Sequence, residues 1–184
     1  MSYENDREAL NSTAKIISIL ITIDTDAVMK AYPNPSKDKN KPTGIGHNYG
    51  FMVAGNTKVN KGQGTGDLDF SASVGDAVRM YALSTSNNFD DSILLYKINK
   101  FSGTEVFSTF RNYDYYKDTP VPGSEAEVLP EKTEKVHFWF HEASIRQAGT
   151  EDYKVTFALY KRNNSGKSEL FGYYDWDPRI QVDG

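Results

Sequence analysis

Short segments in which apolar and polar residues alternate recur along the chain, and this pattern constrains the fold more than any other feature. Within Asp152–Arg162, the side chains of Val155, Phe157 and Leu159 fall on one side of an extended chain. Clusters of Gly, Asn, Asp and Pro separate the segments, and such clusters form turns. The pattern predicts eight strands: Lys15–Asp24, Tyr49–Ala54, Leu68–Ser73, Ala77–Thr85, Ser92–Asn99, Lys135–Ile145, Asp152–Arg162 and Glu169–Trp176.

Eight short strands with frequent turns, and no sustained helical periodicity, predict an all-β fold. We expect a single-domain antiparallel β-sandwich over residues 15–184, either jelly-roll-like or immunoglobulin-like. Residues 1–14 form a polar N-terminal arm, in which Asn5 and Glu8 predict the capping box of a short helix. The connection 112–134 is the predicted hinge. The residues expected to be buried are Ile17, Ile19, Ile21, Phe51, Val53, Phe70, Val78, Leu94, Phe138, Phe140, Val155, Phe157 and Leu159.

A long segment between the first two predicted strands, residues 24–53, shows no evident helix or strand over most of its length. Loops of this length in a compact domain are usually functional or disordered. Tyr32, Ile45 and Tyr49 are residues that pack, and three prolines lower the entropy lost on ordering. We therefore expect a long ordered loop after the first strand, folded against the sandwich with these three residues as its anchors.

Four residues near the end of this loop have expected roles in ordering it. We expect His47 and Asn48 to hydrogen-bond to backbone groups. Gly44 and Gly46 are expected to provide backbone conformations that other residues resist.

Charge and hydropathy exclude two classes of partner. The 21 basic and 25 acidic residues give a net charge of −4, and no basic block could neutralise a row of phosphates, so we expect no nucleic-acid partner. No segment approaches the ~20 apolar residues of a membrane span, so we expect no membrane partner. The first fourteen residues are polar and lack the basic start and apolar centre of a signal peptide, which predicts a cytoplasmic protein.

The common catalytic signatures are missing, so we expect no enzyme. The chain has no cysteine nucleophile and no G-x-S-x-G elbow for a serine. His137 and His141 are four residues apart in a predicted strand, which separates them by about 13 Å, too far to share one zinc ion. We expect both histidines on the outer face of that strand, with Phe138 and Phe140 pointing inward.

Oxygen-rich clusters remain as candidate ligand sites, because calcium binds six to eight oxygen atoms from carboxylates, amides and carbonyls. They are "DTD" at 24–26, "SNNFDD" at 86–91 and "DWD" at 175–177, and none has EF-hand spacing. Calcium is therefore a candidate cofactor. The candidate metal ligands are Asp24, Asp26, Asp90 and Asp91.

The same loops suit a sugar, because hydroxyl groups bind to carboxylates and amides while an aromatic ring covers the apolar face of the sugar. The alternative role of Asn87, Asn88 and Asp91 is to cap the turn before a strand through backbone hydrogen bonds. The candidate sugar-binding residues are Asp24, Asp26, His47, Asn48, Asn87, Asn88 and Asp90.

Several long motifs resemble the PixA/AidA family of bacterial inclusion-body proteins. They are "TIDTDAVMKAYPNPSKDKNKPTGIGHNYGFMV", "GQGTGDLDFSASVGDAVR", "SNNFDDSILLYKI", "EDYKVTFALYKR" and "YYDWDPRI", which together span about Ile16 to Ile180. The resemblance implies a cytoplasmic protein that accumulates massively, often in dense or crystalline inclusions, in host-associated bacteria. It implies no catalytic residue.

Two functions follow from these observations. The first is non-enzymatic self-assembly, in which copies of the chain form a homo-oligomer or lattice; many tyrosines and a low net charge favour such contacts. The alternative is a lectin-like, carbohydrate-binding β-sandwich that recognises glycans with or without calcium.

Overall fold

The computed structural model of the chain describes residues 14–55 and 58–183. The predicted arm, apart from Ala14, and the predicted helix that Asn5 caps lie outside these residues. Strands make up 58% of the structure and helices 6%, in two sheets that do not close into a barrel. The predicted all-β, sandwich-like single domain is therefore confirmed.

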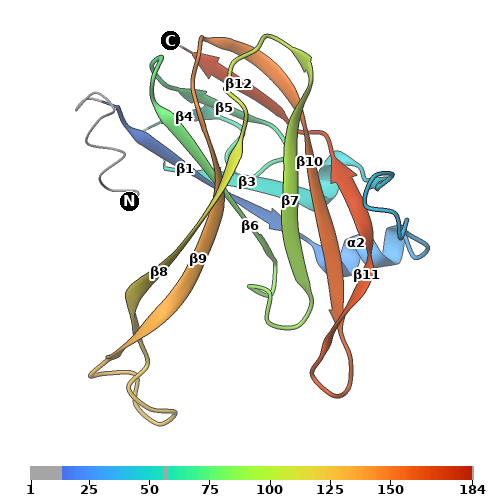
Figure 1. Cartoon of the computed structure of the whole chain (residues 1–184), viewed down its shortest axis with the longest axis vertical. Helices are drawn as coiled ribbons and strands as arrows, with labels where there is room; N and C mark the ends of the chain where they lie inside the picture. Colours follow the sequence, from blue (N-terminus) through green and yellow to red (C-terminus); the bar gives the residue numbers. More distant parts are fainter. Residues whose placement is uncertain (1–13, 56–57, 184) are drawn as a thin grey trace.

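The two sheets pack face to face. The first has the order β3 (Gly50–Ala54), β1 (Ile16–Ile23), β6 (Ala77–Ser84), β9 (Lys132–Ser144) and β8 (Arg111–Val121). The second has the order β2 (Thr43–Gly44), β11 (Ser168–Trp176), β10 (Gly149–Arg162), β12 (Arg179–Asp183), β5 (Leu68–Ser71) and β4 (Val59–Lys61), and β7 (Ser92–Gly103) pairs with β10. Figure 1 shows the course of these strands. Three pairings, β1 with β6, β11 with β2 and β12 with β5, are parallel, so the sheets are mixed rather than purely antiparallel.

The core lies between the sheets and follows the alternation in the sequence. Along β1 every second residue is buried, and the parallel register with β6 places Ile17 beside Val78 and Ile19 beside Met80. Residues of a strand that are two apart share one face of the sheet, so these isoleucines cover the second sheet. Nine residues of the expected core are buried: Ile17, Ile19, Ile21, Phe70, Val78, Phe140, Val155, Phe157 and Leu159.

The other four expected core residues are not buried. Val53 is 41% exposed and Leu94 is 43% exposed, because their neighbours Met52 and Leu95 point into the core instead. Phe51 is half-buried for the same reason. A shift of one residue in the inward-facing set moves every side chain of a strand to the other face.

The fourth, Phe138, is 39% exposed, and the whole of β9 is turned over relative to the prediction. His141 points inward and its Nε2 lies 3.2 Å from the carbonyl oxygen of Leu95 on β7. Phe140 points to the outer face of the first sheet, where Tyr81 and Tyr115 cover its ring. It is buried, but outside the core.

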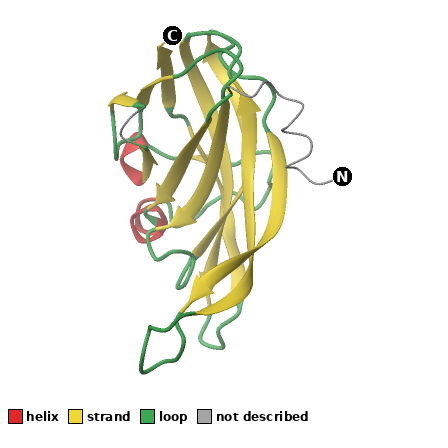
Figure 2. Ribbon diagram, turned by 90° about the vertical axis from the view of Figure 1, so that its left-hand side faces the viewer, coloured by secondary structure: helices red, strands yellow, loops and turns green. Residues whose placement is uncertain are grey.

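The segment after β1 is ordered, as predicted, but it contains a helix that the sequence analysis missed. Asp24 caps α2 (Thr25–Ala31), and a 3₁₀ turn, η1 (His47–Tyr49), precedes β3. Figure 2 shows both on one side of the strands. The sequence analysis missed this helix because it has only seven residues, of which Thr25 and Val28 are buried. Two buried positions are too few to show a helical period.

The predicted anchors hold this segment against the second sheet. Tyr32 accepts a hydrogen bond from the Tyr174 hydroxyl through its carbonyl oxygen, and its own hydroxyl accepts one from the backbone of Gly46. Ile45 is buried, and the ring of Tyr49 meets that of Tyr32 edge to face at 5.6 Å. The prediction for the glycines is wrong, because Gly46 is extended with φ −73° and Gly44 has no positive φ.

The connection 112–134, predicted as a hinge, is instead most of a long β-ribbon. Strands β8 and β9 pair antiparallel from Arg111 with Glu142 to Val121 with Lys132. Figure 1 shows the two strands leaving the rest of the molecule together, and we call them the β8–β9 ribbon. Among the described residues, no helix has the length and apolar character that a membrane span requires.

Candidate functional site

The first pair of predicted ligands, Asp24 and Asp26, belongs to the start of α2. Asp24 Oδ1 accepts a hydrogen bond of 3.0 Å from the backbone of Ala27, and Asp26 lies in the first turn. Carboxylates at these positions satisfy free N–H groups and interact favourably with the helix dipole. Asp24 therefore has a structural role as the cap of α2, and Asp26 lies where a negative charge suits the helix dipole.

The second group lies in the turn between β6 and β7. Asn87 and Asn88 have positive φ angles of 56° and 58°. Asn88 Oδ1 accepts hydrogen bonds from the backbone of Ser84 at 2.9 Å and of Ile93 at 3.1 Å. This is the turn-capping alternative, and for Asn88 the structure shows it directly.

The remaining acidic residues of this turn bind the neighbouring β10. Asp91 Oδ1 accepts a hydrogen bond from the backbone of Arg162, whose side chain donates to the carbonyl oxygens of Phe89 and Asp90. Within residues 14–55 and 58–183, no three His, Cys, Asp or Glu side chains are placed to hold a metal ion. The candidate metal ligands Asp24, Asp26, Asp90 and Asp91 are thus not assembled into a site.

His47 is the predicted ligand that takes part in a polar cluster. Its Nδ1 lies 3.4 Å from Asp67 Oδ1, and its Nε2 lies 3.5 Å from Asp177 Oδ1. We expected His47 to bond to backbone groups, but these contacts are with carboxylates. Asn48 lies beside it in η1.

Two further residues complete what we call the His47 cluster, namely His47, Asp67, Asp152, Asp177 and Arg179. Arg179 Nε donates to Asp152 Oδ1 at 2.7 Å, and the backbone N–H of Arg179 donates to Asp67 Oδ1 at 2.9 Å. Hydrogen bonds from Arg179 and then from Ser102 lower the pKa of Asp152.

The His47 cluster lines a hollow of about 280 Å³ together with the exposed ring of Phe101. Of its members, sequence analysis singled out only His47, and it noted Asp177 within "DWD". Asp67, Asp152 and Arg179 come from distant segments that only the folded sheet brings together.

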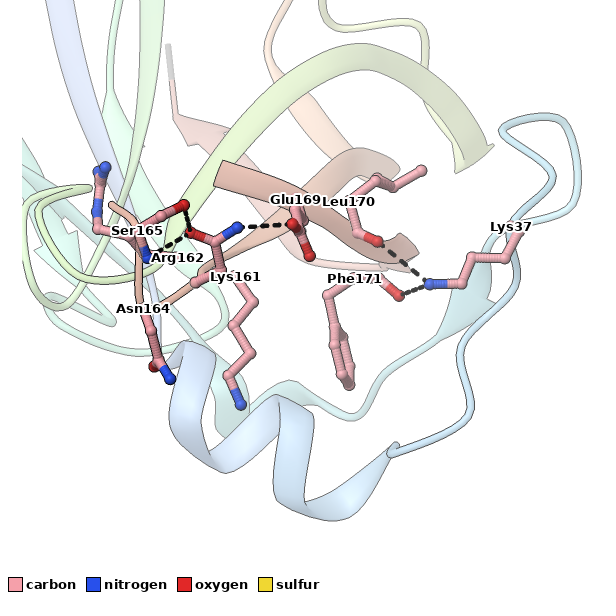
Figure 3. A pocket seen from close by; sticks show the side chains of 9 residues that line it. Lys37, Lys161, Arg162, Asn164, Ser165, Glu169, Leu170 and Phe171 are labelled. Atoms are coloured by element: carbon pink, nitrogen blue, oxygen red, sulfur yellow. Dashed lines mark hydrogen bonds between the residues drawn. The ribbon is translucent and has the colours of Figure 1, made fainter. Parts of the chain in front are cut away.

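A second hollow, of about 590 Å³, lies beside the turn between β10 and β11 (Figure 3). Lys37 Nζ donates to the carbonyl oxygens of Leu170 and Phe171, which ties the long loop to β11. Asn163 Nδ2 donates to Glu169 Oε1 across the turn. Lys37 therefore holds the long loop in place, and Asn163 and Glu169 hold the turn between β10 and β11.

The outer face of the first sheet carries an aromatic group, which we call the outer aromatic cluster: Tyr81, Tyr113, Tyr115 and Phe140. The Tyr113 and Tyr115 rings lie 6.0 and 5.8 Å from that of Phe140. Burial raises the pKa of Tyr115 above its usual value, although this residue lies outside the core.

The β8–β9 ribbon continues this apolar character beyond the body of the sandwich. Tyr116 is 66% exposed, and at the tip of the ribbon Val128 and Leu129 are 66% and 71% exposed. Strand β8 is also the edge of its sheet and pairs only with β9 in the described structure. An edge strand presents unpaired backbone N–H and C=O groups to any chain that approaches it.

Comparison with known proteins identifies the family. Residues 15–182 match the PixA family, which is described as inclusion body protein. The chain belongs to this family. The family prediction from the motifs is therefore confirmed, and the matched residues include the His47 cluster and the β8–β9 ribbon.

A solved relative has the same fold. The crystal structure of an inclusion body protein of the PixA family from Burkholderia cenocepacia J2315 superposes with a TM-score of 0.81 at 31% sequence identity. The similarity covers 95% of this chain and 99% of that one. Comparison with curated proteins gives no match.

Proposed function

We propose that this inclusion body protein is a non-enzymatic protein that assembles with copies of itself into cytoplasmic inclusions, including crystalline ones, in a host-associated bacterium. The observation that carries the proposal is the β8–β9 ribbon, which carries exposed apolar side chains and ends in β8, the edge strand of its sheet among the described residues. Family membership supports it, because the family is one of inclusion body proteins.

Strand β8 is a long edge strand, which runs over Arg111–Val121 and pairs only with β9 among the described residues. Native proteins shorten, bend, cover or charge edge strands to prevent association with other chains, and β8 carries charges and Pro120 but is not short. The net charge of −4 adds little repulsion between copies. Both features favour regular contacts between folded molecules.

Sugar binding is the second candidate function. Of the sugar-binding residues expected from the sequence, only His47 lines the hollow concerned. The hollow at the His47 cluster combines carboxylates, an imidazole and a guanidinium with the exposed ring of Phe101. Such groups accept and donate hydrogen bonds to hydroxyls while the ring packs on the apolar face of a sugar. Each member of the cluster already contacts another member, so a sugar would have to replace existing contacts, and we place this function second.

Overproduction of the intact chain in a heterologous bacterium tests the first function. We expect dense cytoplasmic particles by electron microscopy, whose isolated material dissolves without denaturant and shows the β-rich circular dichroism spectrum of the folded protein. Soluble protein that never forms particles, or particles that dissolve only in denaturant, would contradict assembly. A glycan array with the soluble protein, with calcium and with chelator, tests the second function, and binding abolished by Asp177→Asn would support it.

A further inference from the structure

We infer that a hollow of about 180 Å³ beside the C-terminal half of β7 is a binding site for the ammonium group of a small primary amine. Strands β7 and β10 lie side by side (Figure 1), and both contribute to its lining. The segment 104–110, which leads from β7 to β8, lines the rest. This site is independent of the proposed self-assembly.

Glu151 of β10 supplies a buried charge to this hollow. The residue is only 2% exposed, and its Oε2 accepts the backbone N–H groups of Val106 at 2.5 Å and Phe107 at 3.3 Å. Two such donors suit a charged carboxylate. Across the described part of the chain, no Lys, Arg or His side chain forms an ion pair with Glu151. A buried carboxylate without a cationic partner favours the binding of a cation.

The second polar group is the hydroxyl of Tyr153, which also lines the hollow. Tyr153 is 1% exposed, and its hydroxyl has no hydrogen-bond partner among the described residues. Burial, and then the nearby Glu151 carboxylate, raise the pKa of Tyr153, so the hydroxyl keeps its proton. A buried hydroxyl without a partner costs stability. A ligand with N–H groups would supply the missing hydrogen bond and would donate to Glu151 as well.

Aromatic rings form the apolar part of the hollow. The ring of Phe107 lies 5.3 Å from that of Tyr153 and 5.6 Å from that of Phe110, and all three residues line the hollow. Aromatic faces attract cations and also pack against hydrocarbon groups. The site therefore suits an ammonium group that carries a short alkyl chain.

Other classes of ligand fit these groups less well. An anion would be repelled by Glu151, and a neutral alcohol would gain nothing from its charge. A quaternary ammonium ion has no N–H group to donate to Glu151 or Tyr153. Among the residues that the structure describes, no three His, Cys, Asp or Glu side chains are placed to hold a metal ion. The volume is below that of a typical drug-sized pocket, so the amine is small.

Lys100 is the competing cation, because it lines the same hollow and its side chain is exposed. An ammonium group tethered beside the site would compete with a free amine. Lys100→Ala should therefore leave amine binding unchanged or make it tighter. Weaker amine binding in this variant would contradict a site for a cation.

Amide NMR titration of the dissolved protein tests the site with three probes that have the same number of non-hydrogen atoms: butylammonium, tetramethylammonium and 1-butanol. The backbone amides of Val106 and Phe107 are the reporters, because they donate to Glu151. We expect butylammonium to shift both signals saturably, with a dissociation constant of about 1 mM. The other two probes should bind at least about ten-fold more weakly, because they lack either the N–H groups or the charge.

Two variants separate the roles of the polar groups. Glu151→Gln keeps an oxygen for the backbone donors but removes the charge, so it should weaken butylammonium binding at least about ten-fold. Tyr153→Phe should weaken binding about three-fold or more without lowering the melting temperature, because its hydroxyl has no partner to lose. Tyr174→Phe is the matched control. Its hydroxyl donates to the Tyr32 carbonyl oxygen, so the variant should lower the melting temperature and leave binding unchanged.

The absence of a saturable shift at these two amides would overturn the proposal. Binding of 1-butanol or tetramethylammonium as tight as that of butylammonium would also overturn it, as would unchanged binding by Glu151→Gln. If Glu151→Gln does not fold, Tyr153→Phe decides the question, and wild-type affinity in that variant would contradict the site.

Discussion

Arg79 and Glu142 form an ion pair on the outer face of the first sheet. Arg79 Nη2 donates to Glu142 Oε2 at 2.9 Å, and the two side chains are only 16% and 13% exposed. The Arg79 guanidinium lies 4.0 Å from the ring centre of Phe140. The charged pair and the outer aromatic cluster are thus one packed surface across β6 and β9, next to the β8 edge.

Removing one partner of this pair should cost more stability than removing both. The variant Arg79→Ala leaves Glu142 largely buried without its strongest partner, so we expect a loss of about 2–3 kcal/mol in the free energy of unfolding. The double variant Arg79→Leu, Glu142→Leu should lose less than that. Urea denaturation of the three proteins measures this, and a single variant as stable as wild type would show that the pair is unimportant.

Gly50 should not tolerate a side chain. A β-carbon built at Gly50 meets the indole of Trp176 at 2.8 Å, and Trp176 is buried. Gly50→Ala should therefore destabilise the protein by about 1–3 kcal/mol through overpacking. Gly55→Ala is the matched control, because a β-carbon there meets no atom of the described residues within 4 Å. This variant should change stability by less than about 0.5 kcal/mol. Equal melting temperatures for both variants would refute the predicted contact.

Asn88 should behave as a structural residue and not as a ligand. Its amide oxygen accepts two backbone N–H groups, so Asn88→Ala should lower the free energy of unfolding by about 1–2 kcal/mol. Asn88→Asp keeps both acceptors and should lose less. Thermal unfolding of both variants measures the difference. An unchanged melting temperature for the alanine variant would contradict the structural role of Asn88.

His141 should make stability depend on pH. Burial lowers the pKa of His141, and the hydrogen bond with the Leu95 carbonyl offsets part of that effect. The unfolded chain therefore binds a proton at a higher pH than the folded protein does, and stability falls as pH drops below the ordinary histidine pKa of about 6.5. The loss ends once the pH is below the folded pKa.

Urea denaturation at pH 7.5 and pH 5 tests this for wild type and for His141→Gln. The variant should lose less stability than wild type between the two values, because it carries no proton at this position. His47 and His137 remain in both proteins, so their contributions cancel in the comparison. Identical losses of stability in wild type and variant would show that His141 does not cause the pH dependence.

The sequence predicted the strands well but not always which side faces the core. In β1 the apolar residues alternate with others, which fixed the inward set that includes Ile19. In β3 the residues from Phe51 to Ala54 are all apolar, and in β9 three aromatic residues follow one another, so a period of two gives no preferred side. The packing of the opposite sheet, which is not local information, decides these cases.

The ribbon and the His47 cluster were missed for different reasons. Asp114, Lys117 and Pro120 made β8 resemble a loop, although the alternation of Tyr113 and Tyr115 was a local signal of a strand. The His47 cluster had no such signal. Its members meet only because β10 and β12 pair and the long loop returns to the same edge.

Sedimentation velocity of the purified protein over a wide range of concentrations tests the central claim most directly. Assembly through the β8–β9 ribbon predicts a dimer whose population grows with concentration, followed by larger species. Tyr116→Lys adds an exposed charge to the edge strand β8, which opposes pairing with another chain, and it should shift the population toward monomer while the β-rich circular dichroism spectrum is retained. A wild-type protein that sediments as a monomer at every concentration would contradict the account.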